Sequence, residues 1–283
     1  MRGRASTKVI HRFCSRFVTL ASVRYLRLYR AFAGNNLSRA LEFRAQFVAG
    51  IVAYMIWNGA SLLFIDVVFR QVGAVRGWSR EEMWVLLGTF VILESLCYGL
   101  LGPNMWRFAG AVRDGSLDLN LTKPANTQFL VSTRYMDFNG LLNSVVGVAL
   151  IAFGLGRLGR APAWHEWVLW LVLLACGFVM AYAFWFWMVT WSVWAVKLDS
   201  IAVAFDPVMQ LARFPVQIYP QSVQLLFVTI LPIAFLTTYP AGALLGHPVA
   251  RVLPLALALS GVALWCSHRF FQFALRHYGS ASS

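Results

Sequence analysis

The sequence predicts an all-α polytopic membrane protein with six transmembrane helices. Of its 283 residues, 59% are hydrophobic and only 12% are charged, and the mean hydropathy is +0.65. Soluble domains carry about 25% charged residues, so an ordinary soluble fold is excluded. Aromatic residues make up 15% of the chain, which excludes an intrinsically disordered one. Most of the length is therefore expected in or beside lipid, as a single domain over residues 1–283.

Each transmembrane element follows from an apolar stretch that approaches the roughly 20 residues a helix needs to cross a bilayer. Four stretches are plain, at 45–69, 83–103, 138–156 and 167–195. A fifth and a sixth span are expected in the remaining apolar sequence, so that the bundle occupies residues 45–275.

Residues 1–44 precede the first span as a basic tail. Ten of the 24 lysines and arginines fall here, interleaved with bulky apolar residues such as Phe17 and Tyr29. A basic amphipathic segment of this kind is typical of an anionic membrane surface, and nucleic acid is not expected as a partner.

The remaining basic residues indicate the orientation. With six crossings, the tail, the 106–137 connection and the C-terminal end share one side, and that side holds most of the lysines and arginines. Because cytoplasmic loops carry an excess of these residues, both termini are predicted to be cytoplasmic.

The fifth span has two interpretations. Hydropathy alone favours 223–246 and leaves the residues before it as a cytoplasmic loop. The alternative makes 199–217 the fifth span and folds 218–246 into a broken hairpin within the outer leaflet. Prolines at 215, 220, 232 and 240 interrupt this region, and a helix broken at such intervals crosses a membrane poorly.

Catalytic motifs are absent from the sequence. The pair His165-Glu166 lacks the second histidine of a zinc-protease helix, and no G-x-S-x-G elbow occurs. None of the three lysines, Lys8, Lys123 and Lys197, belongs to a phosphate-binding loop. The chain is therefore not expected to be an enzyme by itself, to hydrolyse ATP or to hold a metal.

Three ionisable residues are candidates for an intramembrane role. Glu94 lies near the middle of the second span, where an unpaired carboxylate is costly. Asp206 and Arg213 are seven residues apart, so on a helix they share one face, and if 199–217 is a membrane span that face must look into the bundle. Glu94 and Arg213 are candidate partners across it. A structural ion pair and a substrate pathway both account for this pattern.

Several segments occur in the order found in one known family. They are Gly77–Met83, Trp106, Arg113–Asp118, Leu121, Lys123-Pro124, Asp199-Ser200, Arg213–Pro215, Ile218–Pro220 and Leu231–Pro240. Together they resemble the permease subunits of bacterial type 2 ABC exporters, specifically a six-span ABC-2 family. Lys123 is a departure, because the family pattern suggests arginine before the proline.

The resemblance implies a half-transporter in the bacterial inner membrane. Two permease chains, identical or paralogous, would face each other above two copies of an ABC ATPase, which would bind ATP and Mg²⁺. The tail would contain an interfacial elbow helix, and the family favours 199–217 as the fifth span, followed by the broken outer-leaflet hairpin. An aromatic interior with few fixed charges indicates a hydrophobic or amphiphilic cargo.

By the same resemblance, the 106–137 loop would carry the coupling helix that docks on the ATPase. The residues expected in this coupling element are Arg113, Asp114, Gly115, Leu117, Asp118, Leu121, Lys123 and Pro124. A solvated loop without a partner is the alternative, since polar loops are commonly that.

Two other function classes compete with the ABC permease. An ion- or proton-coupled secondary transporter would use Glu94 and Asp206 as its protonated pair, although no repeat halves are detectable. A lipid-modifying membrane enzyme is disfavoured by the missing catalytic residues.

Overall fold

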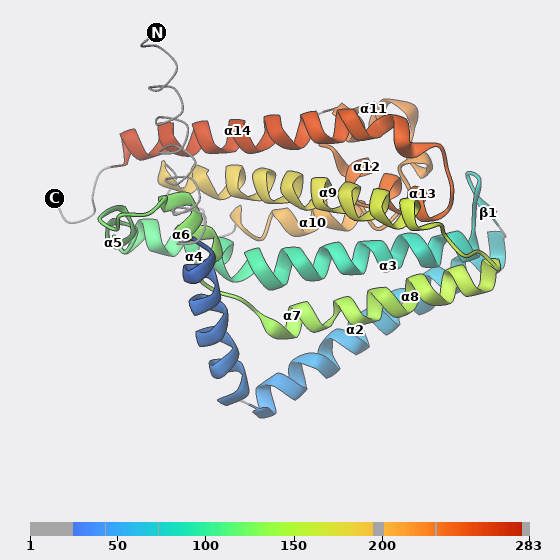
Figure 1. Ribbon diagram of the computed structural model, residues 1–283, viewed down its shortest axis with the longest axis horizontal. Coiled ribbons are helices and arrows are strands. Elements are labelled where there is room, and N and C mark those ends of the chain that lie inside the picture. Colours follow the sequence, from blue (N-terminus) through green and yellow to red (C-terminus); the bar gives the residue numbers. More distant parts are fainter. Residues whose placement is uncertain (1–24, 43, 73, 195–200, 230, 279–283) are drawn as a thin grey trace, which may run out of the picture.

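The computed structural model describes residues 25–42, 44–72, 74–194, 201–229 and 231–278, and these form an all-α bundle with one short β-hairpin. The longer helices are α2 (Arg44–Val72), α3 (Arg80–Leu96), α4 (Gly102–Arg113), α8 (Ser144–Leu158), α9 (Trp164–Thr190) and α14 (Leu253–His277). Helices α3, α8, α9 and α14 run along the long axis of the molecule, with α3 against α8 and α9 against α14 (Figure 1).

Shorter elements connect these helices. They are β1 (Ala74–Val75), β2 (Trp78–Ser79), η1 (Cys97–Leu101), α5 (Asp118–Leu121), α6 (Thr127–Thr133), α7 (Phe138–Leu142), η2 (Trp191–Val193), α10 (Phe205–Leu211), η4 (Val216–Ile218), α11 (Gln221–Thr229), α12 (Ile233–Leu236), α13 (Thr238–Leu244) and η5 (Val249–Val252). We call the end of the bundle that carries β1 and β2 the β end, and the opposite end, which carries α5 and α6, the loop end (Figure 1).

Among the described residues, four helical stretches are long and apolar enough to cross a membrane. They are Arg80–Arg113, Phe138–Leu158, Trp164–Val193 and Val249–His277. The bent pair Gln221–Thr229 and Ile233–Leu244 raises the number to five if it forms one span. Helix α2 is 29 residues long, covers the predicted first span and contains the apolar stretch Val48–Trp57. Six crossings therefore remain a prediction.

The β end is built by local sequence signals. Arg76 and Gly77 both have positive φ, 50° and 86°, which is the backbone of the tight turns that join two antiparallel strands. Ser79 then caps α3: its hydroxyl accepts from the Glu82 amide, and the Glu82 carboxylate accepts from the Ser79 amide at 2.8 Å. The residues before α3 thus form an ordered hairpin.

Close backbone contact joins α3 to α8. A Cβ atom placed on Gly88 would lie 2.5 Å from the Gly147 carbonyl oxygen, and one on Gly147 would lie 2.6 Å from that of Gly88. Nearer the β end, a Cβ on Gly154 would lie 3.0 Å from the Glu81 carbonyl oxygen. Small residues at such contacts let membrane helices approach closely, which gains van der Waals packing where lipid offers no hydrophobic driving force.

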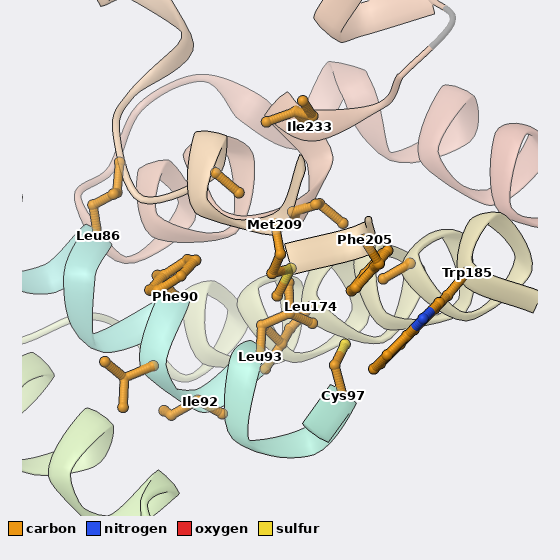
Figure 2. Packing of buried hydrophobic residues seen from close by; sticks show 14 of the residues in the cluster. Leu86, Phe90, Ile92, Leu93, Cys97, Leu174, Trp185, Phe205, Met209 and Ile233 are labelled. Carbon is orange, nitrogen blue, oxygen red and sulfur yellow. The ribbon is translucent and has the colours of Figure 1, made fainter. Parts of the chain in front are cut away.

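The core lies between α3, α9 and the segment around α10. Figure 2 shows Phe90, Leu93 and Cys97 of α3 and η1 facing Met209 and Phe205 of α10. All five side chains are essentially inaccessible to solvent. Residues 85–95 of α3 are buried on every side, which places this part of the helix at the centre of the bundle.

The second long helix continues past its predicted end. The π-helical turn η1 joins α3 to α4, so the helical stretch runs from Arg80 to Arg113. The predicted loop boundary at 106 was therefore too early, because residues 106–113 belong to α4. Asn104 fixes this helix to the far side of the loop: its side chain donates to the Tyr135 carbonyl oxygen at 2.8 Å and accepts from the Tyr135 amide at 2.9 Å.

Residues 201–217 run alongside α3 from the loop end toward the β end. The Trp185 indole donates to the Ala202 carbonyl oxygen at 2.9 Å near the start, and the Trp78 indole donates to Gln217 at 3.2 Å near the end. This is the path of the second interpretation of the fifth span, except that only α10 is regular α-helix. Asp199 and Ser200 lie outside the described residues.

The chain then turns back. Helices α11 and α12–α13 are bent by 66° relative to each other. The Thr237 hydroxyl donates to the Ala212 carbonyl oxygen, and the Thr238 hydroxyl accepts from the Val216 amide at 3.1 Å. The stretch 223–246, which hydropathy alone favours as one straight span, is therefore a broken element packed against residues 212–216.

The N-terminal helix, residues 25–42, crosses the bundle axis instead of following it (Figure 1). The Tyr25 hydroxyl accepts from the Asn126 amide at 3.0 Å, and the Tyr25 ring meets Phe129 edge to face at 4.8 Å. Farther along, the Asn36 side chain donates to the Arg134 carbonyl oxygen at 3.0 Å. These contacts fix the helix to the loop end.

Candidate functional site

The candidate coupling element is a compact turn-and-helix unit between α4 and α6. Asp114 ends α4 with its amide donating to the Gly110 carbonyl oxygen at 2.8 Å. Gly115 follows with φ of 70°, a conformation that favours glycine. Asp118 begins α5, and the chain leaves through Lys123 and Pro124, which are both exposed.

The leucines of this element have different positions. Leu117 is fully buried, so it supports the turn and cannot face a partner. Leu121 is 38% exposed and Leu119 is 67% exposed. An apolar side chain held at a loop tip in this way is available for contact with another protein. Leu119 and Leu121 are therefore the apolar contacts that the element offers.

Charged side chains surround these leucines. Arg113 and Asp114 are exposed and pair at 3.3 Å between Nε and Oδ1. The Lys123 ammonium donates to Asn120 at 3.2 Å, which closes the end of α5. Between α4, α5 and α6 lies a groove of about 700 Å³ whose lining includes Asp114, Leu119, Lys123 and Arg134.

The coupling element also contacts the C-terminal end of the described chain. Tyr278, which follows α14, lies beside Asp118 of α5. Burial and, to a smaller extent, the negative charge of Asp118 raise the pKa of the Tyr278 hydroxyl above its usual range. The hydroxyl is protonated at neutral pH, so it is a neutral neighbour of the Asp118 carboxylate.

The three intramembrane candidates lie together in the bundle. Gln210 donates to the Glu94 carboxylate at 3.1 Å, and the Tyr98 hydroxyl donates to the Asp206 carboxylate at 2.8 Å. The Arg213 guanidinium lies 5.2 Å from the centre of the Phe90 ring and close enough to Glu94 for their charges to interact. We call Glu94, Tyr98, Asp206, Gln210 and Arg213 the polar ladder.

Spacing explains how the polar ladder forms. Glu94 and Tyr98 are four residues apart along α3 and η1, as are Asp206 and Gln210 along α10, so each pair shares a face. Arg213 comes after the end of α10 at Leu211, so the expected two-turn helix from Asp206 to Arg213 is wrong. Arg213 nevertheless points to α3, because residues 212–217 continue along that helix.

A second polar network joins the loop to the long helices. Gln128 of α6 donates to the Tyr182 hydroxyl of α9 at 3.0 Å, and its carbonyl oxygen lies 2.7 Å from Nδ1 of His268 on α14. Ser132 of α6 lies 3.0 Å from the same tyrosine hydroxyl. We call Gln128, Ser132, Tyr182 and His268 the α6 network.

Sequence reasoning missed the α6 network. The available signal was weak: polar Gln128 and Ser132 sit four residues apart in the loop, and His268 lies inside an apolar helix. Among the described residues, no three histidine, cysteine, aspartate or glutamate side chains gather as a metal ion would require.

Comparison with known proteins identifies one family. The family model described as ABC-2 family transporter protein matches residues 55–282, which is most of the chain and includes both the polar ladder and the coupling element. No curated protein and no solved structure shows a significant match.

Proposed function

Because this chain belongs to the ABC-2 family of transporter proteins, we propose that it is the permease subunit of a bacterial ABC exporter whose ATP is hydrolysed by a separate subunit. The family makes the chain a component of membrane transport and not itself a catalyst. The protein therefore provides the path, and its partner provides the energy.

In the proposed orientation the loop end is cytoplasmic and the β end faces outward. The loop end carries the exposed cations Arg107, Arg113, Lys123, Arg134 and Arg276, as the positive-inside rule requires. In this frame α2, α3 with α4, α7 with α8, α9, residues 201–217 and α14 make six crossings. Helices α11 to α13 then form a re-entrant hairpin in the outer half, and the N-terminal helix lies at the inner interface.

The observation that carries the proposal is the form of the loop end. A coupling element must present a fixed surface to the ATPase, and α5 presents Leu119 and Leu121 between the charges of Asp114 and Lys123. Two copies of an ABC ATPase, each with ATP and Mg²⁺, would dock here beneath two permease chains, identical or paralogous.

The α6 network supports a route from this element to the transmembrane helices. A displacement of α5 and α6 reaches α9 through Tyr182 and α14 through His268, and these two helices pack along most of their length (Figure 1). Directionality would come from different cargo affinities of the inward and outward states.

The cargo that fits best is hydrophobic or amphiphilic. The interior between α3, α9 and α10 is lined by aromatic rings, with Trp185 and Phe205 stacked at 4.3 Å and Tyr98 edge-on to Trp185 at 5.6 Å. Rings of this kind offer apolar faces with few polar groups to satisfy, which suits an amphiphile.

The first test is recovery of the tagged chain from its native membrane in mild detergent, followed by mass spectrometry. We expect a stoichiometric subunit with a phosphate-binding loop. In the same experiment the double variant Asp114→Ala/Leu119→Asp should lose most of this subunit, whereas Glu42→Ala, which removes an exposed carboxylate outside the loop, should retain it. A chain that is repeatedly recovered intact and alone would contradict the proposal.

The polar ladder defines the competing function, a proton-coupled carrier that uses Glu94 and Asp206. Glu94→Gln separates the two, because glutamine keeps a hydrogen-bonding group toward Gln210 but cannot bind or release a proton. For an ABC permease we expect ATP-driven export by Glu94→Gln to keep its pH profile. Loss of pH-dependent transport in a folded variant would favour the carrier.

A further inference from the structure

A second cavity at the loop end lies between the N-terminal helix, the start of α4 and residues 135–139. Its volume is about 640 Å³. Arg39 lines it from the N-terminal helix, Trp106 and Arg107 from α4, and Tyr135 and Asp137 from the segment before α7. The cavity is separate from the polar ladder and from the exposed face of α5.

The charged lining of this cavity favours an anion. Arg107 is held in place, because its guanidinium donates to the Pro103 carbonyl oxygen at 2.8 Å and lies 4.5 Å from the centre of the Tyr135 ring. Asp137 is the acidic residue of the lining, and one of its oxygens accepts from the Asn139 amide at 3.0 Å to cap α7. Arg39 and Arg107 therefore leave the cavity with a net positive charge, and guanidinium groups match phosphate oxygens well.

The apolar lining favours an amphiphile over a free ion. Trp106 is 45% exposed and presents its ring at the cavity, and Phe138 and Met136 line the same space. A tryptophan whose ring is apolar and whose N–H is polar is suited to the level of lipid headgroups. Cations with an adjoining aromatic surface match a phosphate joined to an acyl chain.

We propose that this cavity binds the phosphate headgroup of an anionic lipid from the inner leaflet, with Arg39 and Arg107 on the phosphate and Trp106 against the chain. The assignment of the lipid to the inner leaflet rests on the proposed function, because it follows from the cytoplasmic orientation of the loop end. The binding chemistry itself depends only on the residues of the cavity.

The position of Trp106 gives this site a consequence for the transport path. Its ring stacks on Tyr98 at 6.0 Å with 16° between the planes, and the Tyr98 hydroxyl donates to Asp206. An acyl chain held against Trp106 therefore lies one aromatic ring from Tyr98 of the polar ladder. Trp106 therefore contacts both the lipid site and the interior of the bundle.

The test is lipid retention by the purified full chain, measured by native mass spectrometry. The chain is exchanged into detergent with equal amounts of phosphatidylglycerol and phosphatidylcholine, with and without inorganic phosphate. We expect phosphatidylglycerol to be retained preferentially, and millimolar phosphate to leave it bound. Arg39→Gln/Arg107→Gln should reduce this retention about tenfold, Arg107→Lys should reduce it less, and Arg157→Gln, an exposed arginine toward the β end, should not change it.

Equal retention of the two lipids by the wild-type chain, or unchanged retention by the double variant, would overturn the site. Displacement by millimolar phosphate would show that the site recognises the anion without the acyl chain and would also overturn the lipid assignment. If the double variant does not fold, a headgroup-photoreactive phosphatidylglycerol on the wild-type chain decides: label on peptides containing 36–40, 103–107 or 135–139 supports the site, and label confined to other peptides contradicts it. Recovery of the ATPase is independent of these results, so the two proposals can fail separately.

Discussion

The two ends of the bundle are held together in different ways. At the β end, the caps and close ion pairs join residues near each other in sequence: Ser79 with Glu82, Arg80 with Asp66, and Arg160 with Glu166 at 2.6 Å. The hydrogen bond from Trp78 to Gln217 is a long-range contact at this end. At the loop end, side chains from elements far apart in sequence meet, as Gln128 does with Tyr182 and His268.

This difference suggests separate roles for the two ends: the β end stabilises the bundle, and the loop end transmits movement from a partner. Backbone contacts and caps at the β end allow little movement, because α3 and α8 approach too closely at Gly154 to shift without a clash. Side-chain hydrogen bonds at the loop end join separate elements, so one of them can be lost without breaking the backbone of any helix. The comparison predicts that damage at the β end reduces stability, whereas damage at the loop end reduces coupling.

The largest effect is expected from Gly154→Leu. A side chain there meets Val85 at 2.9 Å and the Glu81 carbonyl oxygen at 3.0 Å, so α8 must move away from α3. We expect the free energy of unfolding, measured by denaturation in detergent, to fall by about 3 kcal/mol or more, because the added side chain meets backbone as well as side chains. Gly156→Leu is the matched control on the same helix, because nothing lies within 4 Å of its added Cβ. If the two substitutions destabilise the protein equally, the close contact at Gly154 does not contribute to the stability of the β end.

An intermediate effect is expected from Tyr182→Phe. The change leaves the Gln128 amide without its 3.0 Å acceptor in a buried place, which costs about 1–3 kcal/mol when the group is not satisfied elsewhere. The sharper readout is transport per ATP hydrolysed by the reconstituted complex, which should fall although the protein still folds. Tyr135→Phe serves as the control, since it keeps the ring under Arg107. Unchanged coupling in Tyr182→Phe would mean that the α6 network is only structural.

The smallest effect is expected from Ser79→Ala. Loss of the cap leaves the Glu82 amide without its side-chain acceptor at the start of α3, and such losses cost about 1 kcal/mol. The melting temperature should fall while transport per ATP stays constant. Ser79→Asp keeps an acceptor at this position and should restore most of the stability. A fall in transport per ATP in Ser79→Ala would contradict the prediction that the β end affects stability and not coupling.

Sequence reasoning predicted the long helices well, because apolar length alone determines them. The spans at 138–156 and 167–195 match Phe138–Leu158 and Trp164–Val193 closely. It failed where structure depends on backbone detail that hydropathy does not measure. The turn at Arg76 and Gly77 gave no hydrophobic signal, and the continuation of the helix through η1 to Arg113 crosses a stretch that hydropathy marks as polar.

For the candidate site, the sequence supplied the residues more reliably than their arrangement. Glu94, Asp206 and Arg213 were recognised because charge is rare inside spans, but Gln210 and Tyr98, which bond to the two carboxylates, have no such signal. Leu117 and Leu119 look alike in sequence and differ completely in exposure. Which leucine faces outward depends on how the turn at Gly115 directs α5 against the bundle, and hydropathy does not measure that packing.

The π-helix η1 determines how far α4 is rotated about the helix axis relative to α3. A π-turn accommodates one residue more than an α-turn, and at 3.6 residues per turn one residue corresponds to about 100° of rotation. Removing a single residue from Cys97–Leu101 would swing Asn104 away from Tyr135 and Trp106 away from Tyr98, while shortening the helix by only about 1.5 Å. In evolutionary terms, a one-residue insertion or deletion at this turn redirects the whole loop end and leaves the glycine contacts of α3 and α8 untouched.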